Sequence, residues 1–313
     1  MSAVAQPRIA VAVVSWNTRD LLARCLESFA ADADSGLAEV WVVDNASEDR
    51  SADMVRERFP WVRLVASEEN LGFGRAVNLV ADQTDTEWVA PANADIAMRD
   101  GALAALLDAG ERDPGAGAIA PRLILPDGST QHSVFGFPTI PFALLHAGGV
   151  ARLLPAIGDR IALPGQWDTE RARRVPWAVA AFLIVRRGAW DRVGGFDDRQ
   201  WMYAEDLDLG WRLREAGFAT RYEPRAHVDH ESAAATSQYF GEDLSPHWQK
   251  STYGFLARRR GAGYAWAVGA IEAAGALARS ATATDARKRR SYARWARLHL
   301  GALRSGETLR RHR

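Results

Sequence analysis

The sequence predicts an α/β fold with a doubly wound, mostly parallel sheet, followed by a helical C-terminal appendage. Through the first 120 residues, short β-branched and apolar runs alternate with longer segments whose apolar residues recur at helical spacing. The 313 residues can bury a sizeable core, and 48% hydrophobic with 25% charged residues is ordinary for a soluble globular protein. The net charge is zero, yet residues 250–313 carry 15 Lys and Arg against 3 Asp and Glu. The sequence therefore predicts an acidic α/β domain and a separate basic region.

The first half is expected to contain five strands and four helices. The strands are expected at residues 8–15, 39–45, 61–67, 86–93 and 117–125. The helices are expected at residues 18–30, 48–59, 72–83 and 101–110. Ser47 is predicted to cap the second helix and Asp100 the fourth, because short polar side chains accept hydrogen bonds from the free N–H groups of a first turn.

The second half is less regular. Asp-Gly within "PDGSTQ" (126–131) predicts a hairpin turn, because that pair tolerates positive φ. Residues 135–176 are rich in Gly, Pro and Arg without a sustained period and predict a long surface region. The expected core is completed by a buried strand at 177–187, an amphipathic helix at 205–217 ending at Gly217, and an extended segment at 220–230.

Several classes of protein are disfavoured. Cys25 is the only cysteine, which excludes an internal disulfide and fits a reducing compartment. The first residues lack the basic start and long apolar run of a signal peptide, and no apolar stretch approaches the roughly 20 residues of a membrane span. Gly72 and Gly74 begin a Gly-x-Gly pattern, but Val77 stands where a dinucleotide fingerprint has its third glycine. We expect a cytoplasmic protein that is not a Rossmann dehydrogenase.

A candidate metal site follows the fourth strand. "PANADI" (91–96) places Asn93 and Asp95 at the strand's carboxyl end, where open α/β sheets bind ligands. A carboxylate there is a suitable oxygen ligand for Mg²⁺ or Mn²⁺, although an Asx-rich turn explains the pair as simply. His230 ends the last extended segment and is a candidate further ligand, or a structural histidine. His227 competes with it, but alternation places the two on opposite faces.

A candidate catalytic group begins the helix at 205–217. Glu205, Asp206 and Asp208 lie in its first turn, where acids also compensate the helix dipole. Trp201 and Tyr203 precede them, and aromatic side chains beside carboxylates favour a sugar platform with a general base.

Two further stretches are candidates for nucleotide contacts. Asp44 and Asn45 end the second strand, and a carboxylate there either accepts the N3–H of uracil or thymine or starts a turn. Gly72 opens a helix whose N–H groups can face a diphosphate, and Arg75 adds a positive charge or is simply solvated.

Taken in order, these motifs resemble the family 2 glycosyltransferases of GT-A fold, particularly the bacterial rhamnosyltransferase-like branch. The resemblance covers roughly residues 8–235 and rests on "VAVVSWNTRDLLARCLESF", "VVDNASEDRS", "ENLGFGRAVN", "PANADI", "VGGFDDRQWMYAEDLDLGWRLREAGF" and "YEPRAHVDH". The family's D-x-D-type element corresponds to Asn93-Ala94-Asp95, with Asn93 in place of the first acid. Where members commonly carry a glycine, this chain has Ala180 and Ala181.

The resemblance implies a role for each candidate. Asp206 would be the catalytic base beside Glu205, and Asp95 and His230 would hold the metal. The nucleotide would contact Ser15, Trp16, Asn17, Asp44, Asn70, Gly72, Arg75, Asn93 and Ala94. The sugar or acceptor would contact Trp177, Trp201 and Tyr203. Residues 1–245 would form the catalytic domain, with a nucleotide-binding half at 8–120 and an acceptor half at 121–245, and residues 246–313 the basic helical region.

The expected function is that of an inverting, metal-dependent glycosyltransferase. Its donor would be a nucleoside-diphosphate sugar, with dTDP-rhamnose suggested by the resemblance alone, and its acceptor a hydroxyl of a cell-surface or lipid-linked glycan intermediate. A non-catalytic nucleotide-sugar-binding or scaffold protein and an enzyme that glycosylates a small molecule remain alternatives. A nucleotidyltransferase is disfavoured, because "VVSWNTRD" lacks a basic Gly-rich phosphate loop.

The basic region predicts amphipathic helices. On a helix at 290–304, the arginines fall within an arc of roughly 80°. The opposite side carries Tyr292, Trp295, Ala296, Leu300 and Leu303. The segment 264–278 contains Glu272 and is expected to be interfacial or packed. These helices either bind an anionic membrane surface or dock on the acidic catalytic domain, while nucleic acid is not expected and the oligomeric state is left open.

Overall fold

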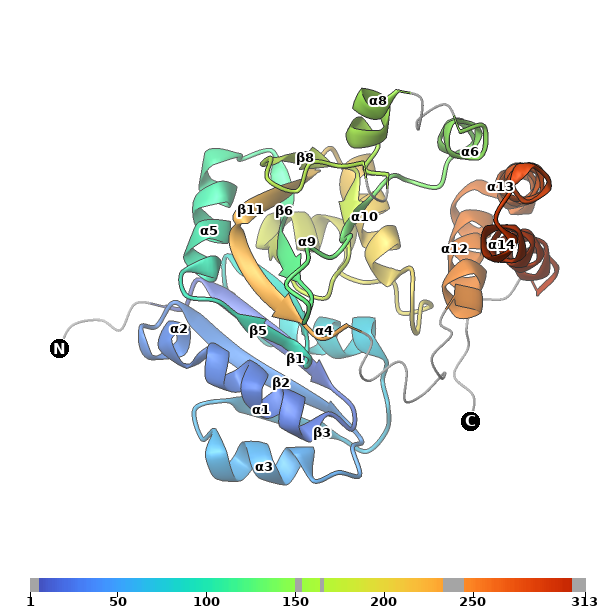
Figure 1. The fold of residues 1–313 in the computed structure, drawn as a ribbon. Helices are drawn as coiled ribbons and strands as arrows, with labels where there is room; N and C mark the ends of the chain where they lie inside the picture. Colours follow the sequence, from blue (N-terminus) through green and yellow to red (C-terminus); the bar gives the residue numbers. More distant parts are fainter. Residues whose placement is uncertain (1–5, 150–153, 164–165, 233–244, 306–313) are drawn as a thin grey trace.

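One sheet of nine strands organises the described part of the chain (Figure 1). The computed structural model describes residues 6–149, 154–163, 166–232 and 245–305. The strands are β1 (Ile9–Ser15), β2 (Ala38–Asn45), β3 (Arg63–Ser67), β4 (Trp88–Asn93), β5 (Ile96–Met98), β6 (Ala116–Ile124), β8 (Arg173–Val175), β10 (Ile184–Arg186) and β11 (Ala219–His230), and β7 (Val134–Phe135) pairs separately with β9 (Trp177–Ala178).

Helices precede, follow and cover these strands. They are α1 (Arg19–Ser28), α2 (Ala30–Asp34), α3 (Ser51–Arg58), α4 (Phe73–Ala81), α5 (Ala102–Arg112), α6 (Ile140–Ala147), α8 (Pro155–Arg160), α9 (Arg187–Val193), α10 (Glu205–Glu215), α12 (Ser245–Arg260), α13 (Ala262–Thr282) and α14 (Ala286–Ser305).

The sheet is mostly parallel, as predicted. Its order is β3-β2-β1-β4-β10-β6-β11-β5, with β8 beside β11. Strands β1, β2, β3 and β4 run parallel, as do β6 and β11, while β10 is antiparallel between β4 and β6. The short strands β5 and β8, which the sequence did not predict, pair antiparallel with β11. Three residues are too few to show a period, and only pairing with the long β11 makes them strands.

Helices cover both faces of the sheet, so the core has two layers. In β1, Ile9, Val11 and Val13 face the layer formed with α1, α3 and α5. Ala12 points to the other layer, which α4, α9 and α10 share. This alternation within a buried strand is what a doubly wound sheet requires.

Three parallel strands end at the same edge of the sheet. In the β1–β2 register Ser15 lies opposite Asp44, and in the β1–β4 register Val14 lies opposite Asn93. The polar residues that follow these strands are therefore neighbours, although they are dozens of residues apart in the chain.

The C-terminal helices dock on the second half of the α/β region. A third apolar cluster joins α10 to α12 and α13, and its members include Trp177, Leu207, Trp211, Phe255, Leu256 and Val268. Helix α13 packs against α6, α12 and α14. Both helices predicted in the basic region are present. Within the described residues, no helix combines the length and apolarity needed to cross a membrane.

The two predicted helix caps are wrong. Helix α5 starts after Gly101, whose φ of +74° turns the chain before the helix, and Asp100 is left exposed. Helix α3 starts only at Ser51, whose N–H is bonded by Asp49. Ser47 instead accepts a hydrogen bond from the Asn17 backbone N–H at 2.9 Å and so ties the loop after β2 to the loop after β1.

Two predictions in the second half need correction. The region 135–176 contains α6, α8 and β8 and buries Phe137 and Trp167, so it is more ordered than its composition suggested. The expected strand at 177–187 is split, because β9 pairs with β7 while β10 enters the main sheet. Between β9 and β10, the Ala181 carbonyl accepts the Asn93 N–H at 2.8 Å, so this part of the chain runs beside the end of β4.

Candidate functional site

Asp95 and His230 meet where β4 ends. Asp95 lies in the turn between β4 and β5, and its backbone carbonyl accepts the N–H of Glu231 at 3.0 Å. The antiparallel pairing of β11 with β5 places His230 opposite Ile96, one residue beyond Asp95. The His230 Nε2 atom consequently lies 3.3 Å from Asp95 Oδ1, and both side chains are buried.

The environment of His230 suits a metal ligand. Its Nδ1 lies 2.6 Å from Gln131 Oε1, and an amide oxygen can only accept a hydrogen bond. The proton therefore belongs on Nδ1, and the Nε2 lone pair faces the Asp95 carboxylate. Two acceptors 3.3 Å apart fit a divalent cation bound by both, whose bonds are about 2.1 Å long for Mg²⁺.

Two candidate metal ligands, Asp95 and His230, meet at this point. No group of three or more His, Cys, Asp or Glu side chains suitable for a metal occurs among the described residues. An ion held by Asp95 and His230 would take its other ligands from water and from phosphate oxygens, as Mg²⁺ usually does.

Asp206 and Glu205 begin α10 after a strained turn. Tyr203 and Ala204 have φ of +61° and +63°, the left-handed region that is unfavourable for side chains other than glycine. The turn is held by Gln200, which donates to the Tyr203 carbonyl and accepts from Arg258 of α12. Strain held in this way is common at functional sites, because the surrounding structure fixes the side chains that follow.

Poor solvation makes both carboxyl groups weaker acids than usual. Burial, together with the charge of Asp206, raises the pKa of Glu205. Burial also raises the pKa of Asp206, while hydrogen bonds from the Leu207 N–H at 2.7 Å and the Ala180 N–H at 3.4 Å oppose that rise. Glu205 therefore retains its proton more readily, and Asp206 is the stronger candidate for a base at neutral pH.

The predicted residues largely share one pocket of about 300 Å³. Candidates from every predicted motif line it, namely Ser15, Trp16, Asn70, Gly72, Asn93, Ala94, Asp95, Tyr203, Glu205, Asp206 and His230. The carboxylates from the end of β4 and from the start of α10 thus face the same space, although 110 residues separate them in the chain.

Five predicted residues do not line this pocket. Asn17 and Asp44 are not among its lining residues, and Asn17 Oδ1 accepts the Glu48 N–H while Asp44 Oδ1 accepts the Ser47 N–H, each at 2.8 Å. Asp44 Oδ2 is buried without a hydrogen-bond partner among the described residues. Arg75 is exposed on α4.

The two remaining predicted residues are tryptophans that pack against other parts of the protein. Trp201 packs on Gly72, where an added Cβ would lie 2.5 Å from the ring, so this position excludes any larger residue. The Gly72 N–H is already bonded to Asn70 Oδ1 at 2.9 Å, which leaves it unavailable to a diphosphate. Trp177 stacks on Phe135 and faces a neighbouring cavity instead of the catalytic pocket.

Other lining residues were missed by sequence analysis. Gln131, Val179, Met202 and Trp248 line the pocket without having been candidates, whereas Asn45, Ala180 and Ala181, which the sequence had already singled out, line it as well. The predicted hairpin at 126–131 was the signal available for Gln131, because it returns the chain toward β6. Trp248 belongs to α12, which the sequence assigned to a separate region.

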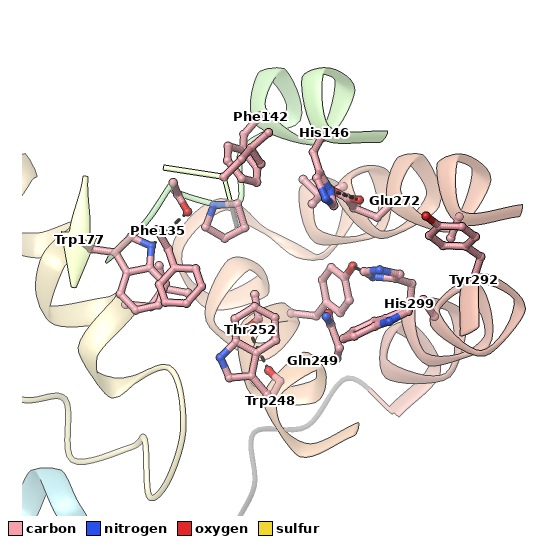
Figure 2. Close-up of a pocket in the computed structure, with 18 of the residues that line it drawn as sticks. Phe135, Phe142, His146, Trp177, Trp248, Gln249, Thr252, Glu272, Tyr292 and His299 are labelled. Carbon is pink, nitrogen blue, oxygen red and sulfur yellow. Dashed lines mark hydrogen bonds and ion pairs between the residues drawn. The ribbon is translucent and has the colours of Figure 1, made fainter. Parts of the chain in front are cut away.

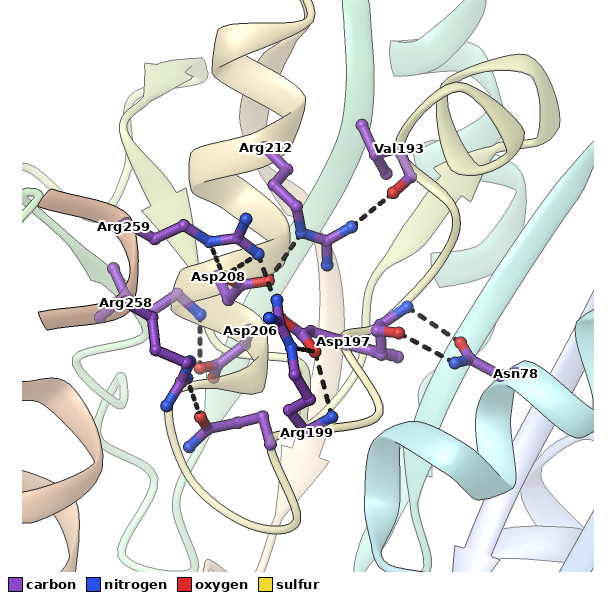
Figure 3. A network of polar contacts seen from close by, with 12 residues as sticks. Asn78, Val193, Asp197, Arg199, Asp206, Asp208, Arg212, Arg258 and Arg259 are labelled. Carbon is purple, nitrogen blue, oxygen red and sulfur yellow. Dashed lines mark hydrogen bonds and ion pairs between the residues drawn. The ribbon is translucent and has the colours of Figure 1, made fainter. Parts of the chain in front are cut away.

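A buried ion network joins α10 to α12 (Figure 3). Asp208 is fully buried and accepts hydrogen bonds from Arg212 of its own helix and Arg259 of α12, each at 2.6 Å. Arg259 also bonds Asp197 at 3.2 Å, and Asp197 pairs with Arg199. The third predicted acid of α10 is therefore structural, and it fixes α12 against the helix that carries Asp206.

Sequence comparison decides the family. Residues 10–134 match the family described as glycosyl transferase family 2. The chain is 36% identical over 264 residues to the N-acetylglucosaminyl-diphospho-decaprenol L-rhamnosyltransferase of Mycobacterium tuberculosis, covering 80% of this chain and 84% of the relative. It belongs to glycosyltransferase family 2. The rhamnosyltransferase WbbL of Escherichia coli is 38% identical over 86 residues, which cover 28% of this chain and 32% of WbbL.

Solved glycosyltransferases share the fold of this family 2 enzyme. The mannosyltransferase PcManGT of Pyrobaculum calidifontis, in complex with GDP-Man and Mn²⁺, superposes with a TM-score of 0.59 over 96% of this chain and 86% of its own, at 18% identity. GalNAc-T7, with UDP, GalNAc and Mn²⁺, superposes with a TM-score of 0.54 over 81% of this chain and 52% of its own, at 13% identity. The predicted GT-A fold and the predicted glycosyltransferase class are confirmed, which removes the scaffold alternative.

Proposed function

We propose that this glycosyltransferase is inverting and metal-dependent, and that residues 1–245 form its catalytic part. The observation that carries the proposal is the meeting of Asp95, His230 and the Glu205–Asp206 pair in one pocket. Such a pocket provides a site for a cation and diphosphate beside a base for an incoming hydroxyl.

Asp206 acts as the general base in this proposal. Its carboxylate accepts the proton of the acceptor hydroxyl while that oxygen attacks the anomeric carbon from the face opposite the diphosphate, so the configuration inverts. The Ala180 and Leu207 N–H groups orient the carboxylate. Glu205 holds a proton more readily, and its buried Oε2 has no hydrogen-bond partner among the described residues, so it is placed to hydrogen-bond a sugar hydroxyl.

Asp95 and His230 would hold a divalent cation beside the donor's diphosphate. A divalent ion bound there supplies positive charge that stabilises the departing diphosphate. Gln131 keeps His230 in the tautomer that leaves Nε2 free to bind. Asp44 and Ser15 lie at the same edge of the sheet, and the unpaired Asp44 Oδ2 is suited to accept the N3–H of a pyrimidine.

The substrates proposed here come from the relatives. The M. tuberculosis relative is named for transfer of L-rhamnose to a decaprenol-linked N-acetylglucosaminyl diphosphate, and it aligns with most of this chain. We therefore propose dTDP-rhamnose as donor and a polyprenyl-diphosphate-linked N-acetylglucosamine as acceptor.

A peripheral membrane location follows from a lipid-linked acceptor. Docking of the C-terminal helices leaves Trp266 65% and Leu277 53% exposed on α13, whose exposed residues from 262 to 278 carry no charge. Helix α14 exposes the basic run 287–290 next to it. An apolar helix face flanked by cations is suited to the headgroup region of an anionic membrane.

A panel of nucleotide sugars with Mn²⁺ tests the donor and the metal. Thermal unfolding should shift most with dTDP-rhamnose, and a ligand at 100 times its dissociation constant stabilises by about 2.7 kcal/mol. EDTA and Asp95→Ala should each abolish most of that shift. A shift equal for all donors, or unchanged by EDTA, would contradict the assignment.

Vesicle co-sedimentation tests the membrane surface. Trp266→Ser with Leu277→Ser, and separately Glu substitutions across 287–290, should reduce binding to anionic vesicles, and raised salt should weaken the wild type. Arg192→Glu, an exposed charge on α9, is the control. Removing α12 is unsuitable as a test, because it would expose the buried Asp208. Equal pelleting of every variant would exclude this surface.

A further inference from the structure

We propose that a second cavity, beside the catalytic pocket, binds the first isoprenoid units of the lipid-linked acceptor. This inference rests on the acceptor proposed above. The cavity holds about 390 Å³ and lies between the catalytic region and the helices α6, α12, α13 and α14 (Figure 2).

The cavity presents mainly carbon atoms. Aromatic side chains converge on it from several elements, and they are Phe135, Phe142, Trp177, Trp248, Tyr253, Tyr292 and Trp295. Leu163, Leu207, Val268 and Ala276 add aliphatic surface. A volume in this range and a lining of this kind are typical of sites for apolar ligands.

Several polar groups in the wall already have hydrogen-bond partners. His146 Nδ1 lies 2.8 Å from Glu272, and the Tyr253 hydroxyl lies 2.5 Å from His299 Nδ1. Burial lowers the pKa of His299 to about 4, so that its ring is neutral at physiological pH. Arg279 donates to the carbonyls of His146 and Ala147. A charged or strongly hydrated ligand would disrupt these pairs, whereas a hydrocarbon would not.

The two cavities share one wall. Trp248 of α12 lines both. Leu207 faces the apolar cavity and Asp206, the adjacent residue, faces the catalytic pocket. In the same way, Trp177 lines the apolar cavity and Val179 lines the catalytic pocket. A sugar whose hydroxyl reaches Asp206 therefore has this cavity next to it, on the side where α12 meets the catalytic region.

The position of the cavity beside the catalytic pocket indicates which kind of ligand it binds. A glycan carrier joins a sugar, a diphosphate and a branched hydrocarbon chain, and only its hydrocarbon suits this lining. The cavity takes a short part of such a chain, and the rest continues toward a bilayer. Helices α13 and α14 supply both the inner wall, through Ala276 and Trp295, and the exposed surface proposed to contact the membrane.

Acceptors with and without a tail test the proposal. The probes are N-acetylglucosaminyl diphosphate carrying a farnesyl chain and the same compound carrying a methyl group, both below their aggregation limits and without vesicles. Each buried CH₂ favours binding by roughly fourfold, so we expect kcat/KM to favour the farnesyl compound by more than about tenfold, chiefly through KM.

Variants of the cavity test whether it causes the preference for the farnesyl compound. Ala276→Phe fills the cavity and Trp295→Ala removes part of its wall, and each should reduce the preference severalfold while leaving kinetics with the methyl compound unchanged. Leu300→Ala is the matched control, because Leu300 is 44% exposed on the same helix and does not line the cavity. A wild type without preference, or two cavity variants that retain it in full, would overturn the proposal.

Direct binding separates this inference from the proposed function. If neither acceptor is glycosylated, the acceptor proposed above is wrong. Binding of radiolabelled farnesyl diphosphate, with inorganic diphosphate as competitor, still reports on the cavity. Binding that Ala276→Phe abolishes and inorganic diphosphate does not displace supports an isoprenoid site. No binding, or full displacement by inorganic diphosphate, overturns it.

Discussion

The two neighbouring cavities differ in chemistry and in origin. The catalytic pocket is lined by Asp95, His230, Glu205 and Asp206, which enter from strand ends and from the first turn of α10. The second cavity is lined mainly by aromatic and aliphatic side chains that α6, α12, α13 and α14 bring together. Short polar motifs create the first, and helix packing creates the second. In our proposal, one fold thus separates the site of bond formation from the site that holds the hydrocarbon.

The wall between the cavities depends on the buried Asp208 network, and its loss is the largest stability effect we predict. Asp208→Ala leaves Arg212 and Arg259 without their buried partner, which should lower the free energy of unfolding by about 3–5 kcal/mol. Denaturant unfolding measures this. Asp53→Ala, which breaks exposed pairs with Arg50 and Arg56, should cost less than about 1 kcal/mol. Equal losses would show that the network does not hold α10 to α12.

Loss of the base should affect turnover and leave the fold intact. Asp206→Asn keeps the shape of the side chain and removes its basicity, so kcat should fall by roughly 10²–10⁴-fold while donor binding persists. Glu215→Gln, an exposed acid on the same helix, is the control. Turnover within a few-fold of wild type would exclude Asp206 as the base and direct the same test to Glu205.

Gln131 tests the proposed metal site through its contact with His230. Gln131→Ala removes the acceptor that fixes the His230 tautomer, so the Mn²⁺ concentration for half-maximal activity should rise by about 10–100-fold. Titration of activity with Mn²⁺ measures this. Gln83→Ala changes an exposed glutamine that follows α4 and donates to the Leu79 carbonyl of that helix, and it should leave the titration unchanged. An unchanged requirement in Gln131→Ala would count against His230 as a ligand.

The pH profile gives the smallest predicted effect. The base must be deprotonated to accept a proton, and burial raises the pKa of Asp206 above that of a free aspartate. The acid limb of kcat/KM should therefore lie well above pH ~4, near which an unperturbed aspartate titrates. The residual activity of Asp206→Asn should lack this limb. A wild-type limb at or below that pH would mean that the titrating group is well solvated.

Sequence alone anticipated the polar pocket better than the apolar cavity. Asp95 and Asp206 could be predicted because each belongs to a local pattern, a strand end or a helix start, whose position in an α/β sheet is known. The fold class followed from the same periodicity. Gln131 could not be predicted, because its contact with His230 joins residues 99 apart and depends on the hairpin's direction.

Tertiary contacts also explain why several predictions from the sequence needed correction. The resemblance assigns Trp177 to the sugar or acceptor, but its ring packs on Phe135 and lines the second cavity. Ser47 had the composition of a helix cap, yet its partner is the Asn17 N–H in another loop. Trp248 belongs to residues 246–313, for which the sequence predicted only a basic helical region. Packing of α12 on α10 nevertheless brings its side chain to both cavities.

Product analysis tests the central claim most directly. The enzyme is incubated with Mn²⁺, dTDP-rhamnose and the farnesyl-linked N-acetylglucosaminyl diphosphate, and the product is analysed by mass spectrometry and NMR. We predict one added deoxyhexose per acceptor, an equal amount of released dTDP, and an anomeric configuration opposite to that of the donor. A product with retained configuration, or donor hydrolysis without transfer to any hydroxyl acceptor, would contradict the account.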